Sequence, residues 1–337
     1  MSVCIVTARR VRQLERCLHS LRAQQDSPSF EVLVGADPDP DVVALVAAQT
    51  MDISVVEVAG SDERPLPPAD KRNVLLARAR GELLLFLDDD VIAAPDLLRR
   101  LVDSARDRPD FAVFGGPNLT PPNSSWFQVV QGAVLGSLVG AGPARRRYGS
   151  HPRGVAREPN FTLCNLAVRA DAMVPFPPGM YGEECATLND LRRRGQRMWY
   201  DPQLAVFHER RPTLRTFLRQ MYIYGRGRGR VMRQSFDKIR TLFLLPLALL
   251  MYLALLPLLA AISLFALVPL ALYAAMVVAQ AAKIAASIPG RWSTAPTAAF
   301  LVVSVHVCYG VGSVAGMLAR PRVRETGPAH WVDLSRP

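Results

Sequence analysis

Three adjacent carboxylates, Asp88, Asp89 and Asp90, directly follow the apolar run 83–87. Adjacent carboxylates repel one another, so packing alone gives no reason for them. Hard cations such as Mg²⁺ or Mn²⁺ bind carboxylate oxygens and bridge to phosphate oxygens. Along a strand, Asp88 and Asp90 point to one side and Asp89 to the other. A metal is therefore predicted at Asp88 and Asp90. The alternative is a solvated acidic turn in which Asp90 caps a helix.

The elements around these carboxylates predict a parallel sheet. The run 83–87, preceded by Gly81 and followed later by Pro95, is typical of a buried strand. Ligands of open α/β folds bind at the carboxyl edge of such strands, where the aspartates emerge. Further strands are predicted at 2–7, 30–35 and 53–58, with helices at 11–21, 41–49 and 73–79 between them and a polar loop at 62–69. This alternation implies right-handed crossovers.

The second half of the chain is less regular. A helix is predicted from Asp96 to about residue 106, and another over 183–194. Strands are predicted at 111–114, 163–168, 197–200 and 204–208. The apolar, Gly-rich run 129–142 is too short for an ordinary membrane span, and it favours an interfacial helix or a plain buried one.

The apolar residues are concentrated near the C-terminus. Of 337 residues, 50% are hydrophobic, and the formal net charge is +11. Residues 241–282 and 293–318 contain no Asp, Glu, Lys or Arg, which predicts about three membrane segments. We therefore expect a catalytic domain at 1–235, transmembrane helices at 236–320 and a tail at 321–337. The chain starts without a signal peptide pattern, which favours a cytoplasmic catalytic domain on a multi-pass plasma membrane protein.

Arginines crowd the approach to the first apolar block. Such a belt marks the cytoplasmic flank and attracts anionic membrane lipids. Three spans would put Arg320, Arg322 and Arg324 outside, against the positive-inside tendency. Two spans with a re-entrant segment, or four spans including the 129 region, would keep these arginines inside. Five unpaired cysteines indicate reduced thiols. The run 226–230 (RGRGR) adjoins a membrane span and no RNA-binding module, so nucleic acid is not an expected partner.

Several further motifs are spaced along the chain. Each is weak alone, because Gly-Glu-Glu is common and a lone histidine is more often structural. Besides Asp88 to Asp90, the chain contains an opening strand ending at Thr7-Ala8-Arg9, then Asp37, Lys71-Arg72-Asn73, Cys164-Asn165, Gly182-Glu183-Glu184, Tyr200-Asp201-Pro202 and His208. In this order, the motifs resemble those of the inverting family 2 glycosyltransferases with a GT-A fold. The resemblance covers roughly residues 2–230.

The resemblance implies a role for each motif. The metal, Mg²⁺ or Mn²⁺, would be held by Asp88, Asp90 and His208. Glu184 occupies the place of the family's base, although many relatives have Asp there, and Glu183 is the other candidate. Cys164 and Asn165 match the strand lining the acceptor pocket. The donor nucleotide and its diphosphate would be bound by Thr7, Arg9, Asp37, Lys71, Asn73, Asp88, Asp89, Arg226 and Arg228.

The implied fold is a mostly parallel α/β GT-A domain followed by transmembrane helices. The implied reaction moves a sugar from a UDP- or GDP-sugar to a hydroxyl of a lipid-linked or glycan acceptor, with inversion. Two alternatives remain open: a synthase that glycosylates polyprenyl phosphate, and an inactive GT-A-like scaffold of a polysaccharide assembly complex. The Tyr-Gly-Arg-Gly run at 224–227 resembles that of membrane-anchored exopolysaccharide-type glycosyltransferases, which implies addition of one sugar to a lipid-linked carrier. A flexible cationic anchor beside the membrane is an equally open interpretation of this run.

Overall fold

A computed structural model describes residues 1–59, 66–177, 183–234, 241–288, 290–319 and 330–333. The chain divides into two compact units. The first unit comprises Met1–Leu119, Ser150–His208 and Arg322–Pro337, and the second comprises Thr120–Gly149 and Glu209–Pro321. The predicted loop at 62–69 and the predicted tail lie partly outside the described residues, and Gly182 lies wholly outside them.

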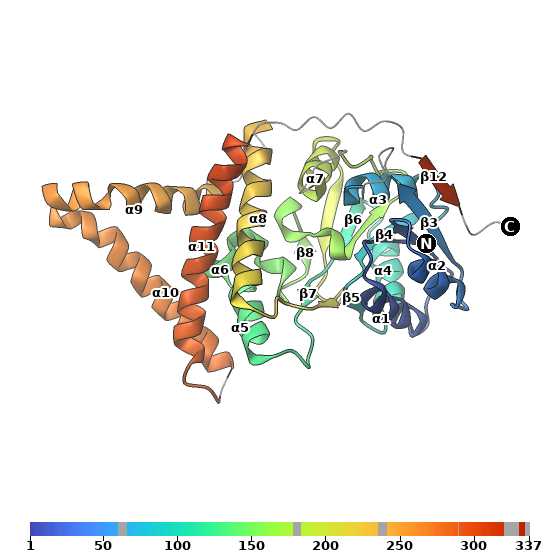
Figure 1. Ribbon diagram of the computed structural model, residues 1–337, viewed down its shortest axis with the longest axis horizontal. Helices are drawn as coiled ribbons and strands as arrows, with labels where there is room; N and C mark the ends of the chain where they lie inside the picture. The colour runs from blue at the N-terminus through green and yellow to red at the C-terminus, as the bar shows by residue number, and fades with distance from the viewer. Residues whose placement is uncertain (60–65, 178–182, 235–240, 289, 320–329, 334–337) are drawn as a thin grey trace. The chain divides into compact units, whose positions relative to one another are not determined.

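Among the described residues, nine strands form the central sheet of the first unit (Figure 1). Their spatial order is β12-β3-β2-β1-β4-β9-β6-β10-β8. The bounds are β1 Ser2–Thr7, β2 Glu31–Ala36, β3 Ile53–Ala59, β4 Leu83–Asp88, β6 Phe111–Gly115, β8 Gly154–Val155, β9 Leu166–Arg169, β10 Arg197–Tyr200 and β12 His330–Asp333. Neighbours from β3 to β4 run parallel, as the alternation predicts, whereas β9 runs antiparallel to both β4 and β6.

A second, three-stranded sheet lies beyond β4 in the sequence. It consists of β5 Val91–Ala93, β7 Asn118–Leu119 and β11 Val206–His208. The strands β5 and β7 were not predicted, because two or three residues are too few to show a periodicity. This sheet matters for the site because β11 pairs with β5, the strand that follows the aspartates.

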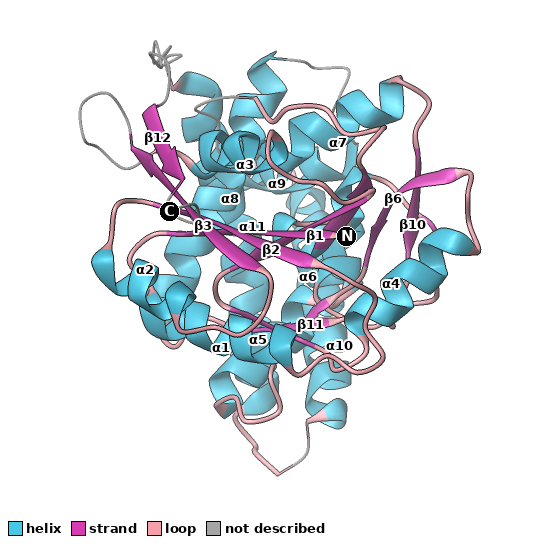
Figure 2. Ribbon diagram, turned by 90° about the vertical axis from the view of Figure 1, so that its right-hand side faces the viewer, coloured by secondary structure: helices cyan, strands magenta, loops and turns pink. Residues whose placement is uncertain are grey.

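Helices cover both faces of the central sheet (Figure 2). One core packs apolar side chains of α1, α2 and α4 against Val3, Ile5 and Leu85, and the other packs α3 and α7 against Cys4 and Phe86. This division follows from the alternation of side chains along each strand. The bounds are α1 Val11–Arg22, α2 Pro40–Ala47, α3 Pro68–Leu76, α4 Leu97–Arg106 and α7 Glu183–Arg193.

Two boundaries differ from the sequence prediction. Helix α3 begins at Pro68 rather than at residue 73, because proline fits the first helical turn, where its missing N–H is not needed. The strand predicted from residue 163 begins at Leu166, because Leu163–Asn165 forms a short 3-10 turn, η3. The other 3-10 turns are η1 Gly142–Arg147, η2 Glu158–Asn160, η5 Thr241–Leu244 and η6 Leu264–Leu267.

The second unit is helical. Its helices are α5 Trp126–Leu135, α6 Leu138–Ala141, α8 Leu214–Gln234, α9 Leu245–Ile262, α10 Val268–Ser287 and α11 Thr294–Leu318. Helices α8 and α11 lie side by side, and α9 and α10 form a hairpin that projects from them (Figure 1). By length and apolar composition, three described helical segments could cross a membrane, as predicted: α9, η6 with α10, and α11.

Candidate functional site

The predicted donor residues of the first unit gather where three neighbouring strands end. Strand β1 pairs on one side with β2, where Thr7 lies opposite Ala36, and on the other with β4, where Val6 lies opposite Asp88. The residues that follow these strands therefore meet at one edge of the sheet. This is the carboxyl edge, where open α/β folds bind ligands.

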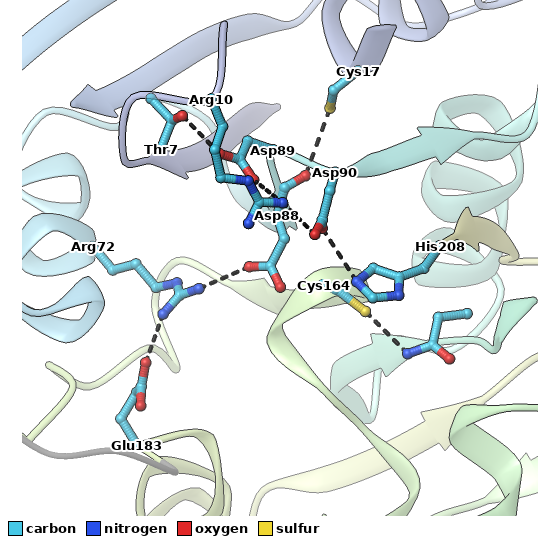
Figure 3. A network of polar contacts seen from close by, with 11 residues as sticks. Thr7, Arg10, Cys17, Arg72, Asp88, Asp89, Asp90, Cys164, Glu183 and His208 are labelled. Carbon is cyan, nitrogen blue, oxygen red and sulfur yellow. Dashed lines mark hydrogen bonds and ion pairs between the residues drawn. The ribbon is translucent and has the colours of Figure 1, made fainter. Parts of the chain in front are cut away.

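The three aspartates have different surroundings (Figure 3). The Asp88 side chain is 36% exposed, whereas that of Asp89 is 4% exposed. Asp89 accepts a hydrogen bond of 2.7 Å from the Thr7 hydroxyl and pairs with Arg10 at 3.0 Å. Burial raises the pKa of Asp89 to about 6. Asp89 thus makes contacts within the fold, and its predicted role toward the donor stays a prediction.

Asp90 contacts His208. The Nε2 atom of His208 lies 3.2 Å from an Asp90 carboxylate oxygen. Strand pairing produces this contact, since His208 lies opposite Val91, the residue after Asp90. Arg10 also forms an ion pair with Asp90. Asp90 and His208 are more than one hundred residues apart in the sequence, and they meet through the pairing of β5 with β11.

Arg72 joins the aspartates to helix α7. One of its guanidinium nitrogens lies 3.0 Å from Asp88, and the other donates to Glu183 at 2.6 Å (Figure 3). The Arg72 side chain is 5% exposed. Burial raises the pKa of Glu183, the negative charge of Glu184 raises it further, and Arg72 opposes both effects. Glu183 and Asp88 are therefore held by one buried cation.

Lys71 forms a second buried ion pair beside the first. Its ammonium group lies 2.7 Å from Asp37 and donates a hydrogen bond of 2.9 Å to the carbonyl of Thr7. Burial lowers the pKa of Lys71. These contacts bring Thr7, Asp37 and Lys71 together, as expected for residues predicted to border one nucleotide.

Other predicted residues serve contacts within the fold. The side-chain amide of Asn73 donates to and accepts from the backbone of Phe176, both at 2.8 Å. Asn165 is buried and donates to the carbonyl of Leu204 at 2.6 Å. Cys164 is also buried, and burial raises its pKa to about 12. The predicted roles of Asn73 toward the donor and of Cys164 and Asn165 toward the acceptor stay predictions.

Three predicted arginines have other surroundings. Arg9 is exposed, in a left-handed backbone conformation with φ of 54°. Arg226 and Arg228 belong to helix α8 of the second unit, where Arg228 is buried with its guanidinium 4.1 Å from the ring centroid of Phe243. A contact of these arginines with a diphosphate stays a prediction.

The sequence reasoning assigned no role to Arg10 or to Arg72. Both adjoin predicted site residues, since Arg10 follows Arg9 and Arg72 lies between Lys71 and Asn73. Their position in these motifs was the available signal. Their partners could not be found from spacing, because Glu183 is 111 residues from Arg72.

The residues fit a divalent cation whose coordination is completed by a bound phosphate. Within the described residues, no three His, Cys, Asp or Glu side chains form a ready metal cluster. The 3.2 Å separation of His208 and Asp90 nevertheless suits two ligands of one ion. Mg²⁺ typically takes one or two protein carboxylates and completes its shell with substrate phosphates. Asp88, Asp90 and His208 supply such a partial donor set.

The sequence was compared with known families. The family described as Glycosyl transferase family 2 matches residues 2–153. The matched region includes β1, β2, the Lys71-Arg72-Asn73 run and the three aspartates. Residues 2–153 match a family 2 glycosyltransferase domain, which marks the chain as a glycosyltransferase. Glu183, Glu184 and His208 follow the matched region in the sequence. In the folded glycosyltransferase, Glu183 contacts Arg72 of the matched region, and His208 contacts Asp90.

Comparison with solved structures gave similar chains, of which PcManGT supports the fold. Mannosyltransferase PcManGT from Pyrobaculum calidifontis, solved with GDP-Man and Mn²⁺, is 18% identical and has a TM-score of 0.63. That match covers 94% of this chain and 86% of PcManGT. TarS of S. aureus, solved with UDP-GlcNAc, is 16% identical over 67% of this chain and 65% of its own, with a TM-score of 0.45. None of the curated proteins matches the sequence significantly. The GT-A fold predicted from the sequence is confirmed.

Proposed function

We propose that this glycosyltransferase moves a sugar from a nucleoside diphosphate sugar to a hydroxyl group of a lipid-linked or polysaccharide acceptor at the cytoplasmic membrane face. The main support is the meeting of Asp88, Asp90, His208 and Glu183 through direct contacts and one shared arginine at the carboxyl edge of the sheet. PcManGT, which shares the fold, was solved with GDP-Man and Mn²⁺. A UDP- or GDP-sugar is therefore the proposed donor class.

The donor would bind across the ends of β1, β2 and β4. Asp37 and Lys71 lie beside Thr7 at the end of β1, which suits contacts to the nucleoside. Asp88, Asp90 and His208 would hold a divalent cation, Mg²⁺ or Mn²⁺, beside the diphosphate. When bound, that cation would stabilise the charge that develops on the leaving diphosphate.

A carboxylate at the start of α7 would act as the base. The acceptor oxygen attacks the anomeric carbon, its proton passes to the carboxylate, and the bond to the diphosphate breaks. One direct displacement inverts the anomeric configuration. Arg72 binds Glu183 at 2.6 Å, which suits a positioning role for that residue. We therefore assign the base to Glu184.

The apolar helices support action at a membrane. Three candidate spans suit a membrane protein, and a lipid-linked acceptor stays in the bilayer. The arginines that precede the first span favour the cytoplasmic side. The acceptor would thus reach the site while its lipid remains anchored.

A screen of sugar nucleotides with the purified full-length protein tests this proposal. We expect Mn²⁺- or Mg²⁺-dependent donor hydrolysis or transfer, which EDTA removes. Asp90→Asn should lower the rate at least 100-fold, and Glu184→Gln should lower transfer 100- to 10,000-fold while donor binding persists. Asp107→Asn, at a carboxylate that is 67% exposed, is the matched control. Equal activity of wild type and Asp90→Asn would contradict the proposed site.

A further inference from the structure

The two ends of the described chain meet in one sheet. Strand β12 pairs antiparallel with β3, with His330 opposite Ala59 and Asp333 opposite Val56. A water-soluble sheet cannot straddle a bilayer, because its open edges and irregular loops would leave polar backbone groups unsatisfied in hydrocarbon. The first unit, here called the catalytic unit, therefore lies with β12 on one side of any membrane.

The segment Thr120–Gly149 belongs to the second unit, but the residues on both sides of it belong to the catalytic unit. Strand β7 ends before it, and β8 follows it within the catalytic unit. This segment contains two helical stretches, α5 at Trp126–Leu135 and α6 with η1 at Leu138–Arg147. Only together are they long and apolar enough for a membrane span, and they are bent by 72° relative to one another. Both ends of the pair return to one folded unit, so the pair does not cross the membrane once. A fourth full span is thereby excluded.

Between His208 and His330, the chain must cross an even number of times. Three candidate spans lie in this interval, so they cannot all cross. We propose that the hairpin of α9 and α10 enters the bilayer, whereas α11 lies with α8 against the membrane surface on the side of the catalytic unit. The inference rests on the membrane insertion included in the proposed function.

Helix α9 has the character of a lipid-embedded segment. None of its residues is buried within the protein. Its exposed side chains are apolar around the whole helix, and Leu258 is 63% exposed. The turn to α10 continues this surface, with Phe265 85% exposed. A helix that is apolar all round and lacks protein cover requires an apolar solvent.

Helix α11 is exposed along one stripe only. Its exposed large apolar side chains are Phe300, Val303, Val311 and Leu318, which recur on one face of the helix. Much of the remainder is buried, including Leu301, Val305 and Gly312. An apolar stripe on one face, with much of the remaining helix covered by protein, needs an apolar surface on that face only, unlike the uncovered helix α9.

Helix α8 covers another face of α11 at very short distance. A Cβ atom added at Gly225 would lie 2.0 Å from the carbonyl oxygen of Tyr309, and one at Gly312 would lie 2.2 Å from that of Tyr222. A Cβ at Gly316 would similarly lie 2.2 Å from the carbonyl of Arg226. From Gly312 to Gly316 on α11, the contacted residue on α8 advances from Tyr222 to Arg226, so the two helices run parallel in close contact. Gly225 on α8, with Gly312 and Gly316 on α11, allows this packing.

Helix α8 carries a row of arginines beside α11. Arg215, Arg219, Arg226, Arg230 and Arg233 recur at separations of four, seven, four and three residues, which places them on one face. If α11 crossed the bilayer, the close packing would carry these charges into hydrocarbon at high cost. At the membrane surface, the same arginines would contact the phosphates of anionic lipids.

Cysteine labelling in sealed membrane vesicles tests the topology. Cys308→Ser is the background, because the other four native cysteines are buried. Single cysteines replace Arg106, on the catalytic unit, and Trp292, which is 92% exposed between α10 and α11; a third is appended after Pro337. An impermeant maleimide should label all three from the same side, within about twofold of one another.

Two labelling results would overturn the inference. An appended cysteine on the side opposite Arg106→Cys would mean an odd number of crossings. Trp292→Cys on the opposite side would mean that α11 crosses. Alkaline carbonate extraction separates this failure from that of the proposed function, because release from the vesicles would disprove membrane insertion itself. Donor turnover, measured on the same labelled samples, tests the chemistry independently.

Discussion

At the scale of single residues, Arg72 is the centre of the site. Its guanidinium binds Asp88, at the end of β4, and Glu183, at the start of α7. Arginine suits this place because its planar group presents several donors in a fixed geometry, whereas lysine offers a point charge. One side chain therefore holds both Asp88, which is proposed to bind the cation, and the start of α7, which is proposed to carry the base.

Replacing Arg72 should therefore affect both stability and catalysis. In Arg72→Gln, the buried Glu183 loses its cation, and we expect a loss of about 3 kcal/mol in unfolding free energy. Arg72→Lys should recover only part, because an ammonium cannot match the fork that holds both carboxylates. Thermal unfolding and kcat/KM measure these effects, with Arg106→Gln at a 72% exposed arginine as control. Wild-type behaviour of Arg72→Gln would contradict the bridging role.

Glu183 should make stability depend on pH. Burial raises its pKa, so the folded state holds the proton more tightly than the unfolded state does. Its contribution to stability is therefore full below the ordinary pKa of a glutamate and declines as pH rises through the raised value. Glu183→Gln should remove this decline, so the variant gains stability relative to wild type as pH rises from 4.5 to about 7. Thermal unfolding at several pH values measures this, and parallel curves would disprove it.

The activity of Glu183→Gln completes that prediction. We expect transfer within about tenfold of wild type, since the assigned base is Glu184 and a missing base costs at least about 100-fold. A loss as large as that of Glu184→Gln would move the assignment of the base to Glu183.

At the scale of elements, the contact of α8 with α11 depends on glycine. A Cβ at Gly229 would lie 2.1 Å from the carbonyl oxygen of Ser313, which is a backbone atom that cannot rotate away. Small residues at helix interfaces allow such close backbone approach. The contact is therefore sensitive to a single methyl group, although alanine has the higher helix propensity.

Gly229→Ala should destabilise the second unit. Overpacking of this kind typically costs about 1–3 kcal/mol, which outweighs the gain in propensity of about 1 kcal/mol. Thermal unfolding in detergent measures the loss. Ala254→Val, on the exposed surface of α9, adds bulk without a protein neighbour and serves as the control. A more stable Gly229→Ala protein would rule out the close contact.

At the scale of the whole molecule, the C-terminal strand returns the chain to its beginning. Strand β12 is the edge strand of the nine-stranded sheet, and it pairs with the side of β3 that would otherwise present unpaired backbone groups. It also determines the parity of the membrane crossings. One short strand thus influences both the sheet and the topology.

Removal of residues 330–337 should expose that edge. We expect faster amide hydrogen exchange in β3, whose pairing with β2 remains, and unchanged exchange in β6, which is distant in the sheet order. Hydrogen exchange with mass spectrometry on both proteins measures this. Identical exchange in β3 would mean that β12 does not pair there, and the parity of the crossings would lose its basis.

Much of the fold was predictable because its signals are local. The apolar run before Asp88, the alternation of strands and helices, and the uncharged stretches each depend on neighbouring residues. The motifs around Lys71 and Glu183 also indicated the fold family and the chemistry. The residues of a contiguous motif could be placed on one element from the sequence, since spacing along a strand or helix determines where side chains point.

The sequence by itself determined the carboxylates, the strands that present them and the apolar helices. Only the tertiary structure decided that Arg72 joins Asp88 to Glu183, that Asp90 meets His208, and that β12 closes the sheet edge. Likewise, only the tertiary structure showed that Gly225 and Gly229 lie against the backbone of α11. The physical reason is that such contacts depend on strand register and helix packing between distant segments, and no local periodicity encodes these.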